Sequence, residues 1–339
     1  MEKIRFGKTG LMVSKVAFGG IPIMRLNMND ASTLVRQAID LGVNFIDTAN
    51  GYTDSEEKIG MAIKDIKRED IVIASKSGAN DKKTFNEHLD LSLKRLGVDY
   101  IDIYQLHNGG SAPKKDIVFK EGGPMEALEE AVKAGKVRYA AFSAHSIPIA
   151  MDMMKSGRFA AVQLPFNYID DAAAESAVPL AKELDIGFIA MKPMGGGLLD
   201  DAGLAFRYLA QFSHIVPDPG IETLDEIKEI INIFNSKEAF SDKDKAEVES
   251  QKKEFGAFWC HRCDYCSPCP QGIGISGVLC AKSAVKRMPV ERAKDFLSAS
   301  MEKARGCTEC RSCVEKCPYD LDIPSLIKER LQYWDSLGA

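Results

Sequence analysis

The sequence predicts an α/β fold, a (β/α)8 TIM barrel followed by a small cysteine-rich module. Between Val16 and about Phe234, short apolar runs alternate with amphipathic stretches, and eight such pairs fit into that length. All nine cysteines lie at or after Cys260, which sets the end of the chain apart. The 339 residues suit one large domain with an accessory unit.

The expected strands are eight short apolar runs. In chain order they are Val16–Phe18, Asn44–Ile46, Ile71–Ala74, Ile101–Leu106, Arg138–Phe142, Ala161–Leu164, Gly187–Met191 and His214–Val216. Helix start and stop signals mark the amphipathic stretches between them, most clearly residues 30–42, 55–66, 84–97, 123–136 and 172–185. A leading hairpin, residues 4–15, is expected to close the bottom of the barrel.

An open, doubly wound sheet is the main alternative, because it shows the same alternation of strands and helices. A dinucleotide-binding sheet of that kind carries a G-x-G-x-x-G motif after its first strand. The segment AFGGIP, which begins at Ala17, does not match that motif. The barrel is therefore favoured.

Composition and charge exclude several classes of protein. With 45% hydrophobic and 27% charged residues, the chain is neither disordered nor collagen-like. A net charge of -5 gives no reason to expect nucleic acid or an anionic membrane as a partner. No apolar run approaches the roughly 18 residues of a membrane span, and the first residues lack the apolar core of a signal peptide. We therefore expect a cytoplasmic protein.

A strongly charged stretch, residues 235–254, separates the two parts of the chain. We expect a barrel over residues 1–235, a charged linker or helix over 236–255, and a mainly helical, ferredoxin-type domain over 256–339. The cysteine motifs of the last segment are the basis for that third assignment.

The cysteines form two runs with short, repeated spacing. They are Cys260, Cys263, Cys266 and Cys269, followed by Pro270, and Cys307, Cys310, Cys313 and Cys317, followed by Pro318. The second run is the bacterial ferredoxin pattern, in which three thiolates hold one [4Fe–4S] cluster and the fourth reaches the other cluster. The first run has one residue fewer before its last cysteine. The pattern predicts two [4Fe–4S] clusters.

The crossing of the fourth cysteine predicts the two ligand sets. One cluster is expected on Cys260, Cys263, Cys266 and Cys317, and the other on Cys307, Cys310, Cys313 and Cys269. Two structural zinc sites are the alternative, although zinc ribbons carry separated C-x2-C pairs rather than three or four cysteines at one spacing. Cys280 lies outside both runs and is interpreted as a small buried hydrophobic residue.

Four polar residues follow three consecutive strands of the expected barrel. Asp47 and Tyr52 come after the second strand, Lys76 ends the third, and His107 ends the fourth. Catalytic residues of such barrels lie at the C-terminal ends of the strands, so these side chains are expected on one rim. A phenol flanked by an ammonium and an imidazole is suited to proton transfer with a carbonyl oxygen.

With these motifs the chain resembles the aldo-keto reductase family over roughly residues 1–234. The matching segments are D-T-A-x2-Y from Asp47, S-E-E-x-I-G from Ser55, the strand-end Lys76, Leu106–His107, Val162–Gln163 and the segment MKPMGGG. With the cysteine runs, it is similar to the subgroup that carries a C-terminal ferredoxin-type domain. The resemblance implies a tetrad of Asp47, Tyr52, Lys76 and His107 and a small carbonyl or alcohol as substrate.

The resemblance also implies NAD or NADP as a cofactor. Its expected contacts are Ser143 and Gln163 at the nicotinamide carboxamide, the backbone amides of Gly195, Gly196 and Gly197 at the pyrophosphate, and Lys192. Ala144 and Met191 stand where the family commonly has an asparagine and a stacking aromatic residue. Glu226 lies near the place of the arginine that grips the 2′-phosphate of NADP, which argues against a preference for NADP.

The segment after the fourth strand, residues 107–124, is rich in glycine and is expected to form an extended rim loop. It is interpreted either as a mobile lid, with Ile117, Val118 and Phe119 against an apolar substrate, or as a loop that packs on the barrel.

Three functions follow from the two halves of the chain. Clusters transfer single electrons and nicotinamide transfers hydride, so a flavin or an organic radical step is expected between them, with a ferredoxin or a flavoprotein as the expected electron-transfer partner. The favoured hypothesis is an oxidoreductase that uses its clusters for electron transfer. The alternatives are an NAD(P)H-dependent reductase with structural or redox-sensing clusters, and a non-catalytic electron-transfer or regulatory protein.

Overall fold

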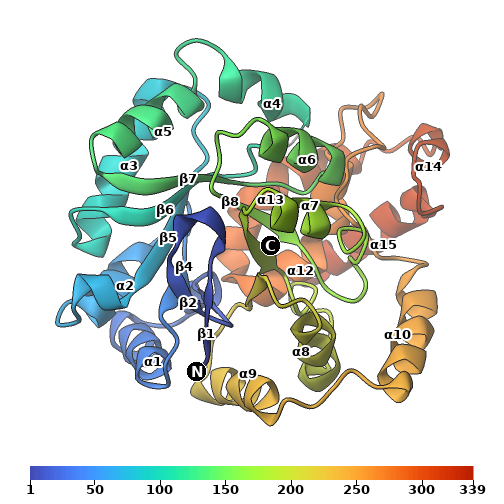
Figure 1. The fold of residues 1–339 in the computed structure, drawn as a ribbon. Helices are drawn as coiled ribbons and strands as arrows, with labels where there is room; N and C mark the ends of the chain where they lie inside the picture. The colour runs from blue at the N-terminus through green and yellow to red at the C-terminus, as the bar shows by residue number, and fades with distance from the viewer. Residues whose placement is uncertain (111, 339) are drawn as a thin grey trace. The chain divides into compact units, whose positions relative to one another are not determined.

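The chain of the computed structural model divides into two compact units (Figure 1). The structure describes every residue except Ser111 and Ala339, and for residues 112 and 113 it describes the backbone alone. The first unit comprises Met1–Met194 and Leu199–Phe240. The second comprises Gly195–Leu198 and the chain from Ser241 onward.

Eight parallel strands form the sheet of the first unit. They are β3 (Phe18–Gly19), β4 (Phe45–Asp47), β5 (Val72–Ser77), β6 (Ile101–Leu106), β7 (Val137–Ser143), β8 (Ala161–Pro165), β9 (Gly187–Met191) and β10 (Ile215–Asp218). Their spatial order follows the sequence, and a parallel bridge from Gly19 to Gly220 links the two outer strands. All eight predicted strands are present, so the barrel is confirmed and the doubly wound sheet is excluded.

Helices follow the strands around the outside of this sheet (Figure 1). They are α1 (Met28–Asp40), α2 (Ser55–Ile63), α3 (Lys82–Leu96), α4 (Ala112–Phe119), α5 (Pro124–Lys133), α6 (Ile147–Lys155), α7 (Ala177–Glu183), α8 (Ala202–Ala210) and α9 (Leu224–Ser236). Short 3-10 turns cover Gly7–Thr9, Pro22–Arg25 and Arg68–Asp70. The caps follow the sequence signals, since the Asp81 side chain accepts a hydrogen bond from Thr84 and the left-handed Gly97 ends α3.

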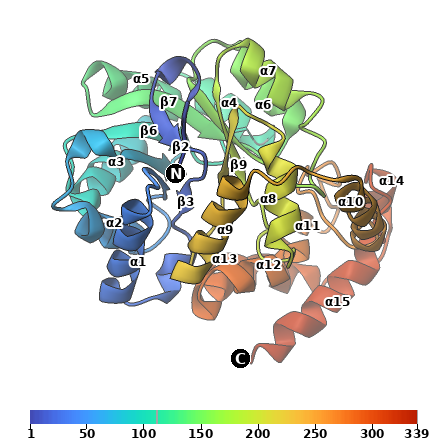
Figure 2. The same ribbon diagram turned by 60° about the horizontal axis from the view of Figure 1, so that its bottom comes forward.

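The N-terminal hairpin fills one end of the barrel, as predicted. Strands β1 (Lys3–Arg5) and β2 (Met12–Ser14) pair antiparallel, and the hairpin lies beside the N-terminus in Figure 2. Phe6, Leu11 and Val13 are buried with apolar side chains from seven of the eight barrel strands. The Phe6 ring lies edge-on to Phe45, with 5.4 Å between ring centroids. This apolar layer leaves the opposite rim for polar side chains.

The rim segment after β6 differs from the expected loop. Residues 112–119 form helix α4, and Val118 is buried. The Phe119 ring lies 6.2 Å from the ring of Phe159, and the Arg158 guanidinium lies 5.2 Å from the Phe119 ring centroid. Val118 and Phe119 therefore pack on the barrel, which supports the second of the two interpretations of this segment.

The second unit is mainly helical. Its helices are α10 (Asp242–Phe255), α11 (Ile275–Leu279), α12 (Ala281–Arg287), α13 (Val290–Ala304), α14 (Ser312–Glu315) and α15 (Ile323–Ser336). The expected charged linker or helix thus contains α10, which begins with a capping box of Ser241 and Asp244. Apolar side chains of α11, α12, α13 and α15 form one core, and six of the eight run cysteines pack against its edge or lie in it.

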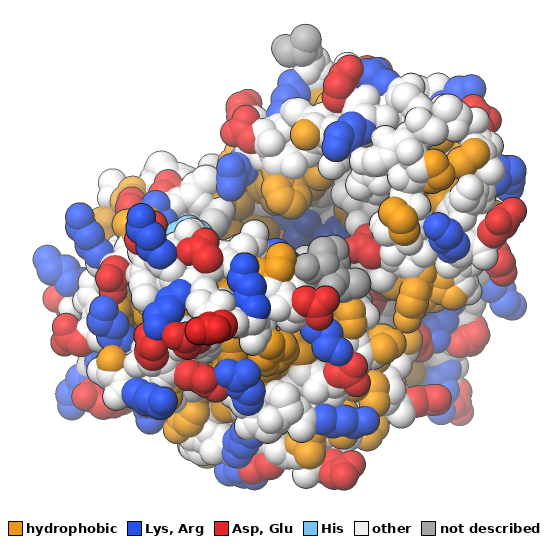
Figure 3. All heavy atoms as spheres, turned by 90° about the horizontal axis from the view of Figure 1, so that it is seen from above, with side chains coloured by type: hydrophobic (Ala, Val, Ile, Leu, Met, Phe, Trp, Pro, Cys, Tyr) orange, Lys and Arg blue, Asp and Glu red, His pale blue; other side chains and the backbone are white. Residues whose placement is uncertain are grey.

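No helix in the described part of the chain is long and apolar enough to cross a membrane. On the face shown in Figure 3, Lys and Arg side chains are interspersed with Asp and Glu. This mixed pattern accompanies the small net charge of -5.

Candidate functional site

The structure brings the four predicted tetrad residues together at the C-terminal rim of the first unit. Lys76, on β5, forms a buried ion pair with Asp47 at the end of β4, and its Nζ donates a 2.7 Å hydrogen bond to the carbonyl of Thr48. The Lys76 Nζ lies 5.2 Å from the centroid of the Tyr52 ring. The rings of Tyr52 and His107 meet edge to face with their centroids 5.9 Å apart.

The ion pair keeps the lysine charged. Burial alone would lower the Lys76 pKa, but the negative charge of Asp47 is the largest of the interactions that raise the pKa above its ordinary value, and the hydrogen bond of Asp47 to the ammonium adds to it. Asp47 is also held by Gln105, whose Nε2 donates to Asp47 Oδ1 over 3.2 Å. A positive charge is therefore fixed beside the Tyr52 phenol.

His107, in contrast, is held in its neutral form. Crowding of protein atoms around its ring, and then the positive charges of Lys76, Lys114 and Lys192, lower its pKa to about 3. The imidazole is neutral at physiological pH, so one ring nitrogen is a hydrogen-bond donor and the other an acceptor. A neutral donor of this kind can orient a carbonyl oxygen without giving up its proton.

Ser143 and Gln163, predicted at the nicotinamide carboxamide, lie side by side on β7 and β8. The Ser143 hydroxyl accepts a 2.8 Å hydrogen bond from the backbone of Asn108. Gln163 donates its amide to Asp218 and Asp47, which leaves its buried Oε1 without a partner among the described residues. A buried acceptor of this kind suits the N–H group of a carboxamide.

The other expected cofactor contacts have partners of their own. Lys192 follows β9, and its Nζ lies 2.6 Å from Nε2 of His145. Gly195, Gly196 and Gly197 all have positive φ angles, between 58° and 84°, and belong to the second unit. There, Lys286 of α12 donates to the carbonyl of Gly197 over 2.7 Å. Gly196 and Gly197 are thus packed against α12.

Glu226 has a structural role that the sequence analysis did not assign. Its carboxylate accepts hydrogen bonds from the backbone of Glu222 and Thr223, at 2.8 and 2.9 Å, and completes a capping box at the start of α9. Its charge is satisfied by the amides of its own helix terminus. Glu226 keeps its negative charge in this capping role, so the expectation that it disfavours NADP stays a prediction.

Two buried polar residues of the rim were missed by the sequence analysis, namely Gln105 on β6 and Asp218 at the end of β10. Gln105 contacts Asp47, and Asp218 accepts from Gln163 over 2.9 Å. Asp218 ends the eighth strand, so the strand-end rule that found Asp47 also applied to it. The expected strand stopped at Val216, two residues too early to include it.

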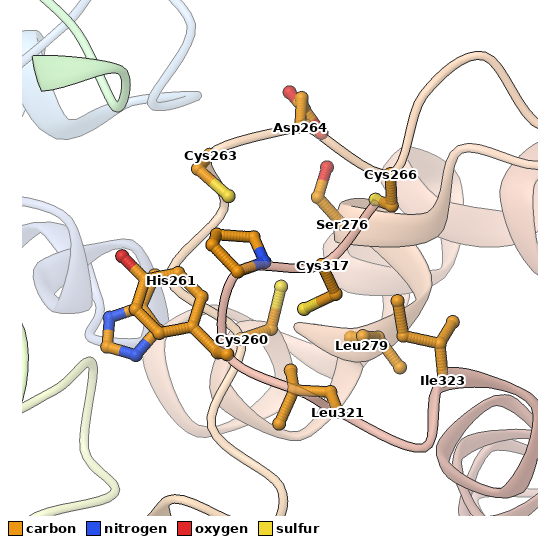
Figure 4. Close-up of a pocket in the computed structure, with 12 residues that line it drawn as sticks. Cys260, His261, Cys263, Asp264, Cys266, Ser276, Leu279, Cys317, Leu321 and Ile323 are labelled. Carbon is orange, nitrogen blue, oxygen red and sulfur yellow. The ribbon is translucent and has the colours of Figure 1, made fainter. Parts of the chain in front are cut away.

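In the second unit, the cysteines gather as the crossing rule predicts. Cys260, Cys263 and Cys266 line one cavity together with Cys317 from the other run (Figure 4). Leu279, Leu321 and Ile323 form its apolar part. The stacked rings of His261 and Tyr319, with centroids 3.8 Å apart, also line it. Four thiols around an apolar cavity are a suitable ligand set for a [4Fe–4S] cluster.

The other four cysteines line a second cavity. Cys307, Cys310 and Cys313 meet Cys269 there, with Ile273, Ile275, Pro324 and Ile327 among the apolar neighbours. Each cavity thus takes three thiols from one run and one from the other. In the described part of the chain, no three His, Cys, Asp or Glu side chains are close enough to hold a single metal ion.

Cys280, interpreted as a small buried residue, is partly exposed. Its thiol is hydrogen-bonded to that of Cys260, a residue of the first cavity. It therefore lies beside a cavity thiol rather than in the apolar core, but it does not line either cavity.

Comparison with known proteins gives a match for each unit. The model of the aldo/keto reductase family matches residues 15–204, and that of a 4Fe-4S dicluster domain matches residues 259–322. An uncharacterized oxidoreductase of Bacillus subtilis, YqkF, is 31% identical over 218 residues, covering 60% of this chain and 68% of that protein. The NADH-specific methylglyoxal reductase of Escherichia coli is 27% identical over 228 residues, covering 59% and 69%.

Solved structures match the same fold. An aldo-keto reductase from Bacillus halodurans in its holo form has a TM-score of 0.63 at 22% identity, covering 74% of this chain and 96% of that one. An aldo-keto reductase from Klebsiella pneumoniae in complex with NADPH has a TM-score of 0.63 at 21% identity, covering 74% and 95%. At these identities the likeness shows the barrel fold.

The His107 imidazole is expected to stay neutral between about pH 5 and pH 8, because its surroundings lower its pKa to about 3. Nitrogen NMR of histidine-labelled protein measures this directly, and the signal is assigned as the one that H107Q removes. A His107 signal that titrates near the ordinary value of about 6.5 would contradict the expectation.

The crossed ligand sets predict that C317S loses the same cluster as C263S, although Cys317 belongs to the other run. Each variant should keep roughly four of about eight irons. After reduction, both should show the same electron paramagnetic resonance spectrum, and C313S should show a different one.

C280S is the matched control and should keep all of the iron. If the spectrum of C317S agrees instead with that of C313S, the crossing is wrong.

Proposed function

This chain belongs to the aldo/keto reductase family, and we propose that it interconverts a carbonyl compound and an alcohol at Asp47, Tyr52, Lys76 and His107. Two [4Fe–4S] clusters in the second unit would carry electrons for this reaction. The observation that carries the proposal is that the Tyr52 ring lies close to both the charged Lys76 and the neutral His107. Homologues named as oxidoreductases support an enzyme rather than a non-catalytic protein.

Tyr52 is the proposed proton donor to the carbonyl oxygen. An unperturbed phenol has a pKa of about 10 and is a weak acid at neutral pH. The adjacent Lys76 ammonium stabilises the phenolate, which makes the proton easier to give. Asp47 keeps Lys76 charged and in place, and Thr48 fixes the ammonium through its carbonyl.

His107 is the proposed orienting group. Its neutral imidazole would donate a hydrogen bond to the same carbonyl oxygen and place it against the Tyr52 hydroxyl. Because a neutral imidazole is a very weak acid, the proton that the carbonyl oxygen receives comes from Tyr52. The two rings are in edge-to-face contact, so a small substrate would be close to both of them.

A bound nicotinamide would supply a hydride to the carbonyl carbon. Gln163 offers a buried, unpartnered oxygen for its carboxamide, and Ser143 lies beside it. Lys192 and the glycines 195–197 remain proposed contacts for the cofactor. Both NAD and NADP fit this proposal.

The clusters would be held by the two crossed sets of four thiols, and they would supply or accept single electrons. A bound flavin or a flavoprotein is the proposed link between those single electrons and the hydride chemistry, and a ferredoxin is the proposed one-electron partner of the clusters. A second candidate keeps the same tetrad but gives the clusters a structural or redox-sensing role. The similarity to an NADH-specific methylglyoxal reductase favours this candidate, because that name implies nicotinamide as the direct reductant.

Replacement of Tyr52 by Phe should lower kcat for carbonyl reduction about 10²- to 10⁴-fold, the usual contribution of a general acid. The assay is anaerobic reduction of methylglyoxal with NADH or NADPH. Y100F is the matched control, because Tyr100 precedes β6 at the opposite end of the strand and its ring packs against Arg68. Unchanged turnover in Y52F would remove the tetrad from the mechanism.

The same reaction, followed at the cluster absorbance band, separates the two cluster roles. Bleaching or recovery of the band during turnover supports electron transfer. Turnover with a constant band supports the structural or sensing role.

A further inference from the structure

A second carboxyl group lies behind the Asp47–Lys76 ion pair. Asp218, at the end of β10, is only 8% exposed, and Asp47 is 2% exposed. Gln163 Nε2 donates to both carboxyl groups, over 2.9 Å to Asp218 Oδ2 and 3.3 Å to Asp47 Oδ2. The two carboxyl groups are also within hydrogen-bond reach of each other. These side chains form one buried network inside the first unit.

The charges of this network do not balance if both acids are ionised. Lys76 from β5 is the positive group that acts on Asp218, and Asp47 from β4 is the negative one. Gln163 from β8 is uncharged, and β3 presents Gly19, which has no side chain. Two buried carboxylates against one ammonium would leave an uncompensated charge, which is costly in a protein interior. Burial and then the charge of Asp47 accordingly raise the pKa of Asp218 well above its ordinary value.

Hydrogen bonding agrees with a neutral Asp218. A protonated carboxyl has one O–H group to donate, and Asp47 is an acceptor within reach. Asp218 Oδ1 has no partner among the described residues and lies 2.9 Å from the point where a Cβ on residue 19 would stand. A larger residue at position 19 would therefore crowd the Asp218 carboxyl group, and glycine avoids this. Asp218 and Asp47 together accept the amide hydrogen bonds of Gln163, which leaves Gln163 Oε1 without a partner among the described residues.

We propose that Asp218 is a positioning residue of the tetrad, a neutral carboxylic acid that donates to Asp47 and orients Gln163, so that Lys76 is balanced by one carboxylate only. The proposal rests on the proposed function of the tetrad. Ionisation of Asp218 would add a second negative charge beside Lys76. That charge would oppose the ammonium and make Tyr52 a weaker acid.

Infrared difference spectroscopy tests the proton directly and needs no activity. Wild-type protein at neutral pH should show the C=O stretching band of a protonated carboxylic acid, and D218N should lack that band. Asparagine has the same shape and can still accept from Gln163, so the fold should be retained. Absence of the band from the wild-type spectrum, or its persistence in D218N, overturns the proposal.

Two buried acids serve as controls for the assignment. Glu56 is also buried with a raised pKa, for which burial is the main cause, so E56Q identifies any contribution from that residue. Asp102 is buried and forms ion pairs with Arg68 and Arg138, at 2.6 and 2.9 Å. D102N should therefore leave the band unchanged.

The positioning role has a second readout in the pH profile. Over the pH range in which the wild-type band disappears, kcat/KM for methylglyoxal should fall severalfold more in wild type than in D218N, because only the wild type gains the negative charge. Parallel profiles over that range overturn the positioning role. A wild-type enzyme that does not reduce methylglyoxal counts against the proposed function, while the infrared result still decides the state of Asp218.

Discussion

The buried ion pair between Lys76 and Asp47 is the interaction on which the proposed chemistry depends. An ammonium in a protein interior is costly unless a carboxylate and further hydrogen bonds compensate it. Here the carboxylate is that of Asp47 on β4. The carbonyl of Thr48 accepts a hydrogen bond from Lys76, and the amide of Gln105 donates one to Asp47. The parallel register places these groups together, because Lys76 is paired with Gln105 across β5 and β6. The barrel thus fixes a positive charge at one side of the Tyr52 ring.

The second unit uses a different constraint, namely short spacing in sequence. Three thiols separated by two residues each are brought to one cavity by the local chain, and the fourth thiol must come from elsewhere. The two runs exchange their last cysteines, so neither cavity is complete without both segments. The apolar core of α11, α12, α13 and α15 holds the two segments side by side. Each ligand set is therefore complete only when this core holds both segments together.

Much of the fold and of the tetrad was predictable, because both follow from local rules. Apolar runs of strand length gave the eight strands, and the strand-end rule located Asp47, Lys76 and His107. Asp218 escaped the same rule because Pro217 and Asp218 do not look like strand residues, although both pair with β9. Helix α4 escaped because glycines on both sides of it suggested a loop. The roles of Glu226 and of the glycines 195–197 depend on the residues that the fold brings close to them. A local sequence pattern does not predict those neighbours.

The central claim is that the ammonium of Lys76 makes the Tyr52 phenol more acidic. The most direct measurement is the ultraviolet absorbance of tyrosinate as a function of pH, taken as wild type minus Y52F and repeated in the K76M background. The account predicts that Tyr52 ionises below the ordinary value of about 10 in wild type and at a higher pH in K76M. Ionisation at the same pH in both backgrounds would contradict it.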